Sequence, residues 1–191
     1  MTEEHRHDYR RCVACEDVLG QTLTSEERIE VIRSYARRYP HIRRFIETGT
    51  ANGDTCAALV DEFDQLWTIE LDAGCVDVAR QRFANQSKVY CCQGESDKWL
   101  ADLAVTGSMA PTVYWLDAHA CGGARAEKAT PVLEEVDAIL SAGHKNVILV
   151  DDVRLFGTEP EWPPLSELTA KLIKEGYVIQ ITDDILRAVP A

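Results

Sequence analysis

The stretch ETGTANGDT, residues 47–55, decides the fold that this sequence predicts. It follows the short apolar segment Phe45-Ile46, which indicates a strand, and it leads into a helix that we expect to begin near Asp54. Gly49 and Gly53 can adopt backbone conformations that other residues avoid, so they allow a sharp turn and a close approach of the backbone to a ligand. The N–H groups at the start of the helix would face the same place.

Strand and helix patterns alternate on both sides of this loop. Apolar runs bounded by turn residues predict strands, and apolar residues three or four positions apart predict helices. The runs at 112–116 and 147–150 have no polar alternation, which is typical of strands buried on both faces. The expected helices lie at 24–38, 57–63, 72–83, 96–103, 131–143 and 164–176, and the expected strands at 45–46, 66–69, 88–92, 112–116, 147–150, 177–181 and 185–189.

This alternation predicts an α/β fold in which helices cover both faces of a doubly wound, mostly parallel sheet. Only the short segment 182–184 joins the last two strands, so no crossover fits between them and we expect them to pair antiparallel. The expected organisation is an N-terminal helical extension at 1–40 followed by one sheet domain at 41–191.

Acidic residues in and beyond the loop narrow the kind of ligand that fits. Glu47 is poorly placed for a pyrophosphate and suits a ligand with an ammonium or sulfonium group and ribose hydroxyls. Glu70 ends the second strand, about twenty residues past the glycines, where an acid hydrogen-bonds the ribose of nucleoside cofactors. Glu95 and Ser96 follow the third strand and would form the opposite wall, although Ser96 serves equally well as a helix cap. A purely structural turn is the alternative for the loop.

Three further carboxylates end neighbouring strands. Asp117 follows the fourth strand, and Asp151 and Asp152 follow the fifth. Uncompensated anions at such close range repel one another, so cations or protons must compensate them. Hard oxygen ligands of this kind suit Mg²⁺. The alternatives are that the acids orient the amino group of a cofactor, or that they pair with arginines such as Arg154, which could instead clamp an anionic acceptor.

The segments ETGTANGDT, TIELD, QGES, YWLDAH and ILVDDVR resemble class I methyltransferases in order and spacing, over residues 43–190. The resemblance implies a Rossmann-like sheet of seven strands with an antiparallel last strand, and S-adenosylmethionine as the cofactor. It places the methionine part at the glycine loop, the ribose at Glu70 and the adenine near the third strand. The expected cofactor contacts are Glu47, Gly49, Thr50, Gly53, Thr55, Glu70, Glu95, Ser96 and Asp117.

Within that family the chain looks closest to the metal-dependent O-methyltransferases for catechols and macrolide sugars. The resemblance implies that Asp117, Asp151 and Asp152 hold Mg²⁺ or another divalent ion, and that a hydroxylated small molecule, a sugar or secondary metabolite, is methylated on oxygen. The catechol enzymes have a lysine shortly after the strand-four aspartate, and this chain has His119 two residues after Asp117. The expected catalytic pair is therefore His119, as the base, with Asp117. The alternative is that His119 only bonds the loop.

Two other functions remain open in the sequence. One is a methyltransferase-like protein that binds the cofactor without transferring its methyl group, and the other is a metal-independent N-methyltransferase. The three acids argue against the first, and LDAH in place of an N/D-P-P-Y-like motif argues against the second. The net charge of -12 argues against a nucleic-acid partner, and the absence of a long apolar run argues against a membrane span. We expect a cytoplasmic protein with a small-molecule acceptor, and an arginine-rich N-terminal helix that could support a homodimer.

The remaining candidates are cysteines and loop aromatics. Seven scattered cysteines do not form a disulfide framework. The segments 121–130 and 156–163 would carry acceptor specificity, with Phe156 and Trp162 available for stacking and Trp115 expected in the core. A zinc site at the N-terminus is a weaker alternative to simple core packing, and its ligands would be His5, His7, Cys12 and Cys15.

Overall fold

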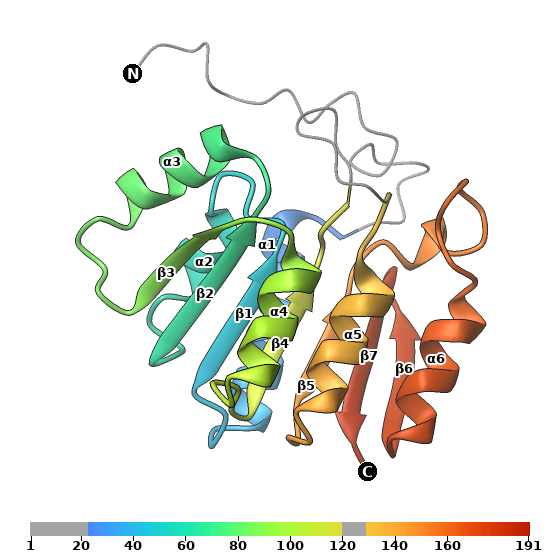
Figure 1. Ribbon diagram of the computed structural model, residues 1–191. Helices are drawn as coiled ribbons and strands as arrows, with labels where there is room; N and C mark the ends of the chain where they lie inside the picture. Colours follow the sequence, from blue (N-terminus) through green and yellow to red (C-terminus); the bar gives the residue numbers. More distant parts are fainter. Residues whose placement is uncertain (1–22, 120–128) are drawn as a thin grey trace.

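The computed structural model describes residues 23–119 and 129–191. These residues form one seven-stranded sheet in the order β3-β2-β1-β4-β5-β7-β6 (Figure 1). The strands are β1 (Arg44–Thr48), β2 (Gln65–Glu70), β3 (Val89–Gln93), β4 (Thr112–Leu116), β5 (Val147–Val150), β6 (Tyr177–Thr182) and β7 (Ile185–Pro190). The zinc ligands suggested at the N-terminus, His5, His7, Cys12 and Cys15, lie outside the described residues, as do residues 120–128.

The pairing of neighbouring strands confirms the predicted sheet. β2, β1, β4 and β5 run parallel, with β3 parallel to β2 at one edge. β7 pairs antiparallel with both β5 and β6, as the short connection at 182–184 predicted. β4 and β5 are buried along their whole length, because helices cover them from both sides.

Helices pack on the two faces of the sheet and separate two apolar clusters. One face is covered by helices from the first half of the chain, and their cluster includes Ile32 of the first helix. The other face is covered by helices from the second half, and its cluster includes Val136 and Leu168 (Figure 1). The helices are α1 (Ser25–Arg38), α2 (Asp54–Leu59), α3 (Ala73–Arg82), α4 (Ser96–Val105), α5 (Val132–Ser141), α6 (Leu165–Lys174) and the 3-10 helix η3 (Val153–Leu155).

Helix starts follow local side-chain chemistry. Thr24 and Glu27 form a capping box at α1, and Asp72 accepts from the N–H of Cys75 at 3.0 Å and caps α3 as predicted. The prediction for α4 was off by one position, because Glu95 occupies the cap and Ser96 turns inward as the first helical residue.

The short helix α2 begins near Asp54, as the glycine loop predicted, and not at 57 as the apolar pattern over 57–63 predicted. It begins at Asp54, directly after the left-handed Gly53, and ends at Leu59. The chain then turns so that the ring of Phe63 packs on that of Phe45, with 5.3 Å between their centroids. Within residues 23–119 and 129–191, no helix is both long enough and apolar enough to cross a membrane.

Candidate functional site

The glycine loop lies directly against the end of β4. Gly49 has φ +83° and donates its N–H to the carbonyl of Ile69 at 2.9 Å. A Cβ atom on Gly49 would lie 2.7 Å from the carbonyl oxygen of Asp117. The N–H of Asp117 in turn donates to the carbonyl of Thr48 at 3.2 Å. The loop after β1 and the acid after β4 therefore share one edge of the sheet, at the top of Figure 1.

At this loop, Glu47 and Thr50 have buried side chains that both contact Thr68 of β2. Glu47 is 1% exposed and accepts a hydrogen bond from the hydroxyl of Thr68 at 2.7 Å. The Thr68 hydroxyl also contacts the hydroxyl of Thr50, which is buried as well. Burial raises the pKa of Glu47 to about 7, against the hydrogen bonds that favour the charged form. The structure thus buries the side chains of these two predicted cofactor contacts and connects them through Thr68 of β2.

Glu70 fastens the loop to the neighbouring strand. Its carboxylate accepts the N–H of Ala51 at 3.0 Å and the N–H of Asp72 at 2.9 Å. A carboxylate offers about four acceptor sites. Two backbone bonds therefore leave Glu70 with capacity to accept ribose hydroxyls.

The other predicted cofactor contacts lie at the starts of helices. Gly53 is the left-handed cap of α2, and Thr55 is half-buried in the first turn of that helix. Glu95 is partly exposed and pairs with Lys98 at 2.7 Å, whereas Ser96 is buried beneath it. The structure places these groups at the carboxyl ends of β1 and β3.

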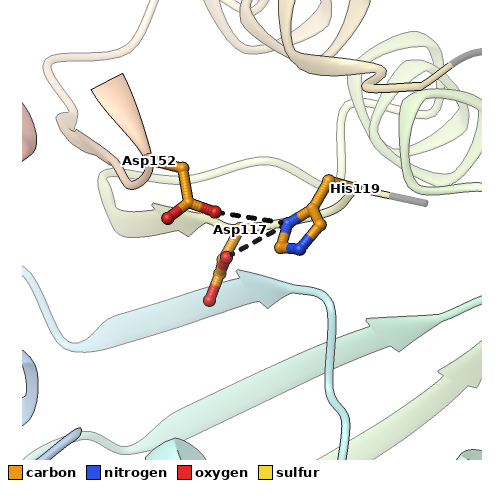
Figure 2. Close-up of side chains that lie close together, drawn as sticks. All are labelled: Asp117, His119 and Asp152. Carbon is orange, nitrogen blue, oxygen red and sulfur yellow. Dashed lines mark ion pairs between the residues drawn. The ribbon is translucent and has the colours of Figure 1, made fainter. Parts of the chain in front are cut away.

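A cluster of two carboxylates and one imidazole stands beyond β4 and β5 (Figure 2). Nδ1 of His119 lies 3.6 Å from Oδ1 of Asp117 and 3.5 Å from Oδ2 of Asp152. The donor atoms of these three residues all lie within 4.8 Å of one another. Asp152 reaches this position from a left-handed backbone with φ +59°. Burial first, and then the charge of Asp117, raises the pKa of Asp152 to about 6.

The third predicted metal ligand, Asp151, is directed elsewhere. Nη1 of Arg28, from α1, lies 3.2 Å from its carboxylate, whose side chain is 1% exposed. Neither oxygen of Asp151 accepts a well-aligned hydrogen bond from the described residues. Burial, together with the charges of Asp117 and Asp152, raises the pKa of Asp151 well above its usual range.

Arginine also compensates the neighbouring acids. Nη1 of Arg154 lies 2.7 Å from Asp152 and contacts Asp184 as well. Asp151, Asp152 and Asp184 form a second group whose donor atoms lie within 4.8 Å of one another. Arg28 and Arg154 pair with the three acids of this second group and compensate part of their charge. The predicted trio is therefore divided, and His119 takes the place of Asp151 beside Asp117 and Asp152.

A hollow opens over this cluster, and the ring of Trp162 borders it. The ring of Trp162 lies 6.3 Å from that of His119, and Phe156 packs edge-on against Trp162 at 5.1 Å. Trp115 is 2% exposed and belongs to the core, as predicted. The hollow is lined by Leu116, Asp117, Ala118, His119, Thr130, Val132, Glu135, Val150, Asp151, Asp152 and Trp162.

Glu135 is a member of this hollow that the sequence reasoning missed. It lies on α5, is fully buried, and has a pKa raised by burial to about 7. The signal was present in the sequence, because Glu135 shares the spacing of Val132, Val136 and Ile139, which form the apolar face of the helix. An acid on such a face is either paired or functional.

No protein-family profile and no curated protein matches this chain. Its similarity is to solved structures of methyltransferases. A Staphylococcus aureus protein assigned as a caffeoyl-CoA O-methyltransferase aligns with a TM-score of 0.61 and 14% identity, over 88% of this chain and 85% of that one. Precorrin-6y C5,15-methyltransferase from Geobacter metallireducens aligns with a TM-score of 0.57 and 14% identity, over 88% and 90%.

A third solved structure, CalS10, was determined with S-adenosylmethionine bound. This amino pentose methyltransferase from Micromonospora echinaspora aligns with a TM-score of 0.56 and 12% identity, over 87% of this chain and 89% of that one. At such identities the likeness is one of fold. The fold of this chain is the Rossmann-like fold of class I S-adenosylmethionine-dependent methyltransferases.

Proposed function

We propose that this chain is an S-adenosylmethionine-dependent methyltransferase that methylates a hydroxyl group of a small molecule with the help of a divalent ion. The observation that carries the proposal is the contact between Gly49 and the backbone of Asp117. It joins a glycine loop of the cofactor-binding kind to the cluster of Asp117, His119 and Asp152 at one sheet edge. The solved methyltransferase structures with the same fold support this proposal.

The chain's own residues fit the cofactor. The tight turn at Gly49 brings the backbone to the sheet edge, and the Glu70 carboxylate beside it has acceptor capacity for ribose hydroxyls. Ser96 and Glu95 border the side where the adenine would lie. When bound, S-adenosylmethionine supplies an electrophilic methyl group. The protein then contributes chiefly by holding the acceptor oxygen in line with that group.

The donor set also fits a divalent ion. Two carboxylates and an imidazole with donor atoms within 4.8 Å suit Mg²⁺ or a borderline ion such as Mn²⁺. Asp117, His119 and Asp152 would hold the ion, and Asp151 would join them only if Arg28 moved away. When bound, the ion would lower the pKa of an acceptor hydroxyl.

Two roles for His119 follow from this arrangement, and a metal titration separates them. As a ligand, His119 would bind the ion through Nδ1, which faces Asp117 and Asp152 (Figure 2). As the base, it would take the acceptor proton while the two carboxylates fix its orientation. Replacement by alanine would abolish the metal signal in the first case and only methyl transfer in the second.

Calorimetric titration tests the proposal. S-adenosylmethionine, S-adenosylhomocysteine, Mg²⁺ and Mn²⁺ are titrated separately into the unmodified chain, Asp152→Asn and Asp117→Asn. Asp102→Asn, at an exposed position on α4, is the matched control. We expect micromolar cofactor binding in all four proteins and a metal signal that only the unmodified chain and the control retain.

Each other outcome is informative. Cofactor binding without a metal signal in the unmodified chain would contradict the metal-assisted mechanism. No cofactor binding at all would contradict the proposed function. With binding established, transfer of a labelled methyl group to a panel of sugars and phenols would test the acceptor class.

A further inference from the structure

The inner end of the hollow is formed by a buried acid that the mechanism above does not use. Glu135 stands on the inward face of α5, between buried Val132 and Ile139, and has no exposed surface. It lines the same hollow as Asp117 and His119. It therefore faces the place where the reacting groups would meet.

Glu135 lacks a hydrogen-bond partner among the described residues. Neither of its carboxyl oxygens accepts a well-aligned hydrogen bond from them. The hydroxyls of Ser96 and Thr48 lie close enough to favour its charged form, but neither forms a hydrogen bond within the usual distance and angle limits. Burying a polar group without a partner costs free energy, and such groups in folded proteins call for a specific explanation.

Within residues 23–119 and 129–191, Glu135 also has no cationic partner. Arg28 pairs with Asp151, and Arg154 pairs with Asp152, so two acids of the hollow have cationic partners. Among the residues that the structure describes, no lysine, arginine or histidine forms an ion pair with Glu135. A ligand that brings a positive charge would supply both the missing polar contact and the missing counter-charge of Glu135.

We propose that Glu135 recognises the sulfonium charge of S-adenosylmethionine, an inference that rests on the proposed function. Thr48, at the start of the glycine loop, is close enough to Glu135 to affect its pKa, and Glu135 also lines the hollow of Asp117 and His119. The sulfur of a cofactor held by the loop, with its methyl group directed at the acceptor, would lie between these two places. Glu135 is thus a residue that distinguishes the cofactor from its product.

Methyl transfer removes the positive charge that Glu135 would contact. In methyl transfer the carbon–sulfur bond breaks with its electron pair left on sulfur, a carbon–oxygen bond forms, and the proton of the acceptor hydroxyl passes to a base, for which His119 lies in the hollow. The sulfonium becomes a neutral thioether, so its attraction to an anionic Glu135 disappears. Glu135 would therefore favour the charged cofactor over the product and would help the product to leave.

Titration calorimetry at pH 8 tests this assignment with three probes. S-adenosylmethionine is charged at sulfur, sinefungin carries an ammonium group in its place, and S-adenosylhomocysteine has neither. We expect Glu135→Gln to weaken the first two by about 10-fold and the third by less than about 2-fold. Glu134→Gln, the neighbouring acid on α5, is the control and should leave all three affinities unchanged.

Further results decide the remaining cases. Glu135→Asp keeps the charge and should recover part of the preference for the charged probes, provided that circular dichroism shows a folded protein. Equal weakening of all three probes by Glu135→Gln, or no change in any, would overturn the assignment and leave Glu135 with a structural water only. No binding of any probe to the unmodified chain would overturn the proposed function itself.

Discussion

Two buried glutamates, Glu47 and Glu135, couple the stability of the folded chain to pH. Burial raises the pKa of each from 4.5 to about 7. Between these values the folded state keeps a proton that the unfolded state has lost, so stability falls as pH rises from about 4.5 to 7 and is level above that. Each group can account for at most about 3 kcal/mol of this loss, since one pKa unit corresponds to about 1.4 kcal/mol.

Replacing Glu135 by glutamine should remove its share of the pH dependence. The charges of Asp97 and Glu134 add to the burial of this group, and glutamine has no proton to lose. Between pH 5 and pH 8 we expect Glu135→Gln to lose up to about 3 kcal/mol less stability than the unmodified chain. Urea unfolding at the two pH values measures this, with Asp102→Asn, at an exposed position on α4, as the control. Equal losses in Glu135→Gln and the unmodified chain would show that Glu135 is not buried as described.

Gly49 is limited by its backbone conformation and by its contact with Asp117. A Cβ atom at φ +83° would be strained and would lie 2.7 Å from the Asp117 carbonyl oxygen. Gly49→Ala should lower stability by about 1–3 kcal/mol and weaken cofactor binding, because the loop must move away from β4. Gly143→Ala is the matched control, since Gly143 has φ +69° and nothing within 4 Å of the added atom. If thermal melts show that Gly49→Ala and Gly143→Ala destabilise the chain equally, the close approach to Asp117 adds nothing to the backbone strain at Gly49.

At the scale of elements, α1 is tied to the site by one ion pair. Arg28 reaches from the first turns of α1 to Asp151 behind β5. Arg28→Ala should destabilise the chain by about 1–3 kcal/mol at pH 8, because Asp151 would remain buried without its cation. The loss should shrink at pH 5, where the raised pKa of Asp151 lets it take up a proton. Arg37→Ala, at an exposed pair on the same helix, should change the unfolding free energy by less than about 0.5 kcal/mol.

The sequence predicted the elements better than their contacts. β4 and β5 were recognisable because burial on both faces leaves an uninterrupted apolar run, and α3 because Asp72 caps it. The apolar pattern placed the short α2 three residues too late, because fewer than two turns give little periodicity, whereas the glycine loop predicted its start near Asp54. The spacing of apolar residues depends on positions that are close in the chain, and for that reason it predicts single helices and strands.

The sequence predicted the acids of the candidate site and named Arg154 as a possible partner, but it did not reveal the pairing of Arg28 or the burial of Glu135. Asp117 and Asp152 followed from the rule that ligands bind at the carboxyl ends of strands. Arg28 and Asp151 are far apart in the sequence, and no periodicity relates them. Glu135 was missed because an acid in a helix is normally exposed. Side-chain pairing across elements depends on packing, which a single sequence does not encode locally.

At the scale of the molecule, strand order creates the site. β1 and β4 are neighbours in the sheet, so the carbonyl of Thr48 accepts from the N–H of Asp117 across 69 positions of sequence. β5 lies beside β4 and adds Asp152, and the antiparallel β7 beyond it adds Asp184 through the preceding turn. The switch in strand order at β1 and β4 is the place where an open α/β sheet binds ligands. An ion held by Asp117, His119 and Asp152 would connect the ends of β4 and β5.

Metal binding should therefore stabilise the whole fold and not the loops alone. An ion that binds only the folded state adds about 1.4 kcal/mol at ten times its dissociation constant, which raises the melting temperature by about 3–6 °C for a chain of this length. We expect Mn²⁺ or Mg²⁺ to produce this shift, a chelator to reverse it, and Asp152→Asn to abolish it, whereas Asp102→Asn should keep it. Because Asp152→Asn removes a ligand shared by both acid groups, a shift that survives in this variant would place the ion elsewhere. An imidazole ligand further predicts a larger shift with Mn²⁺ than with Mg²⁺ at equal concentration, and His119→Ala should remove that difference.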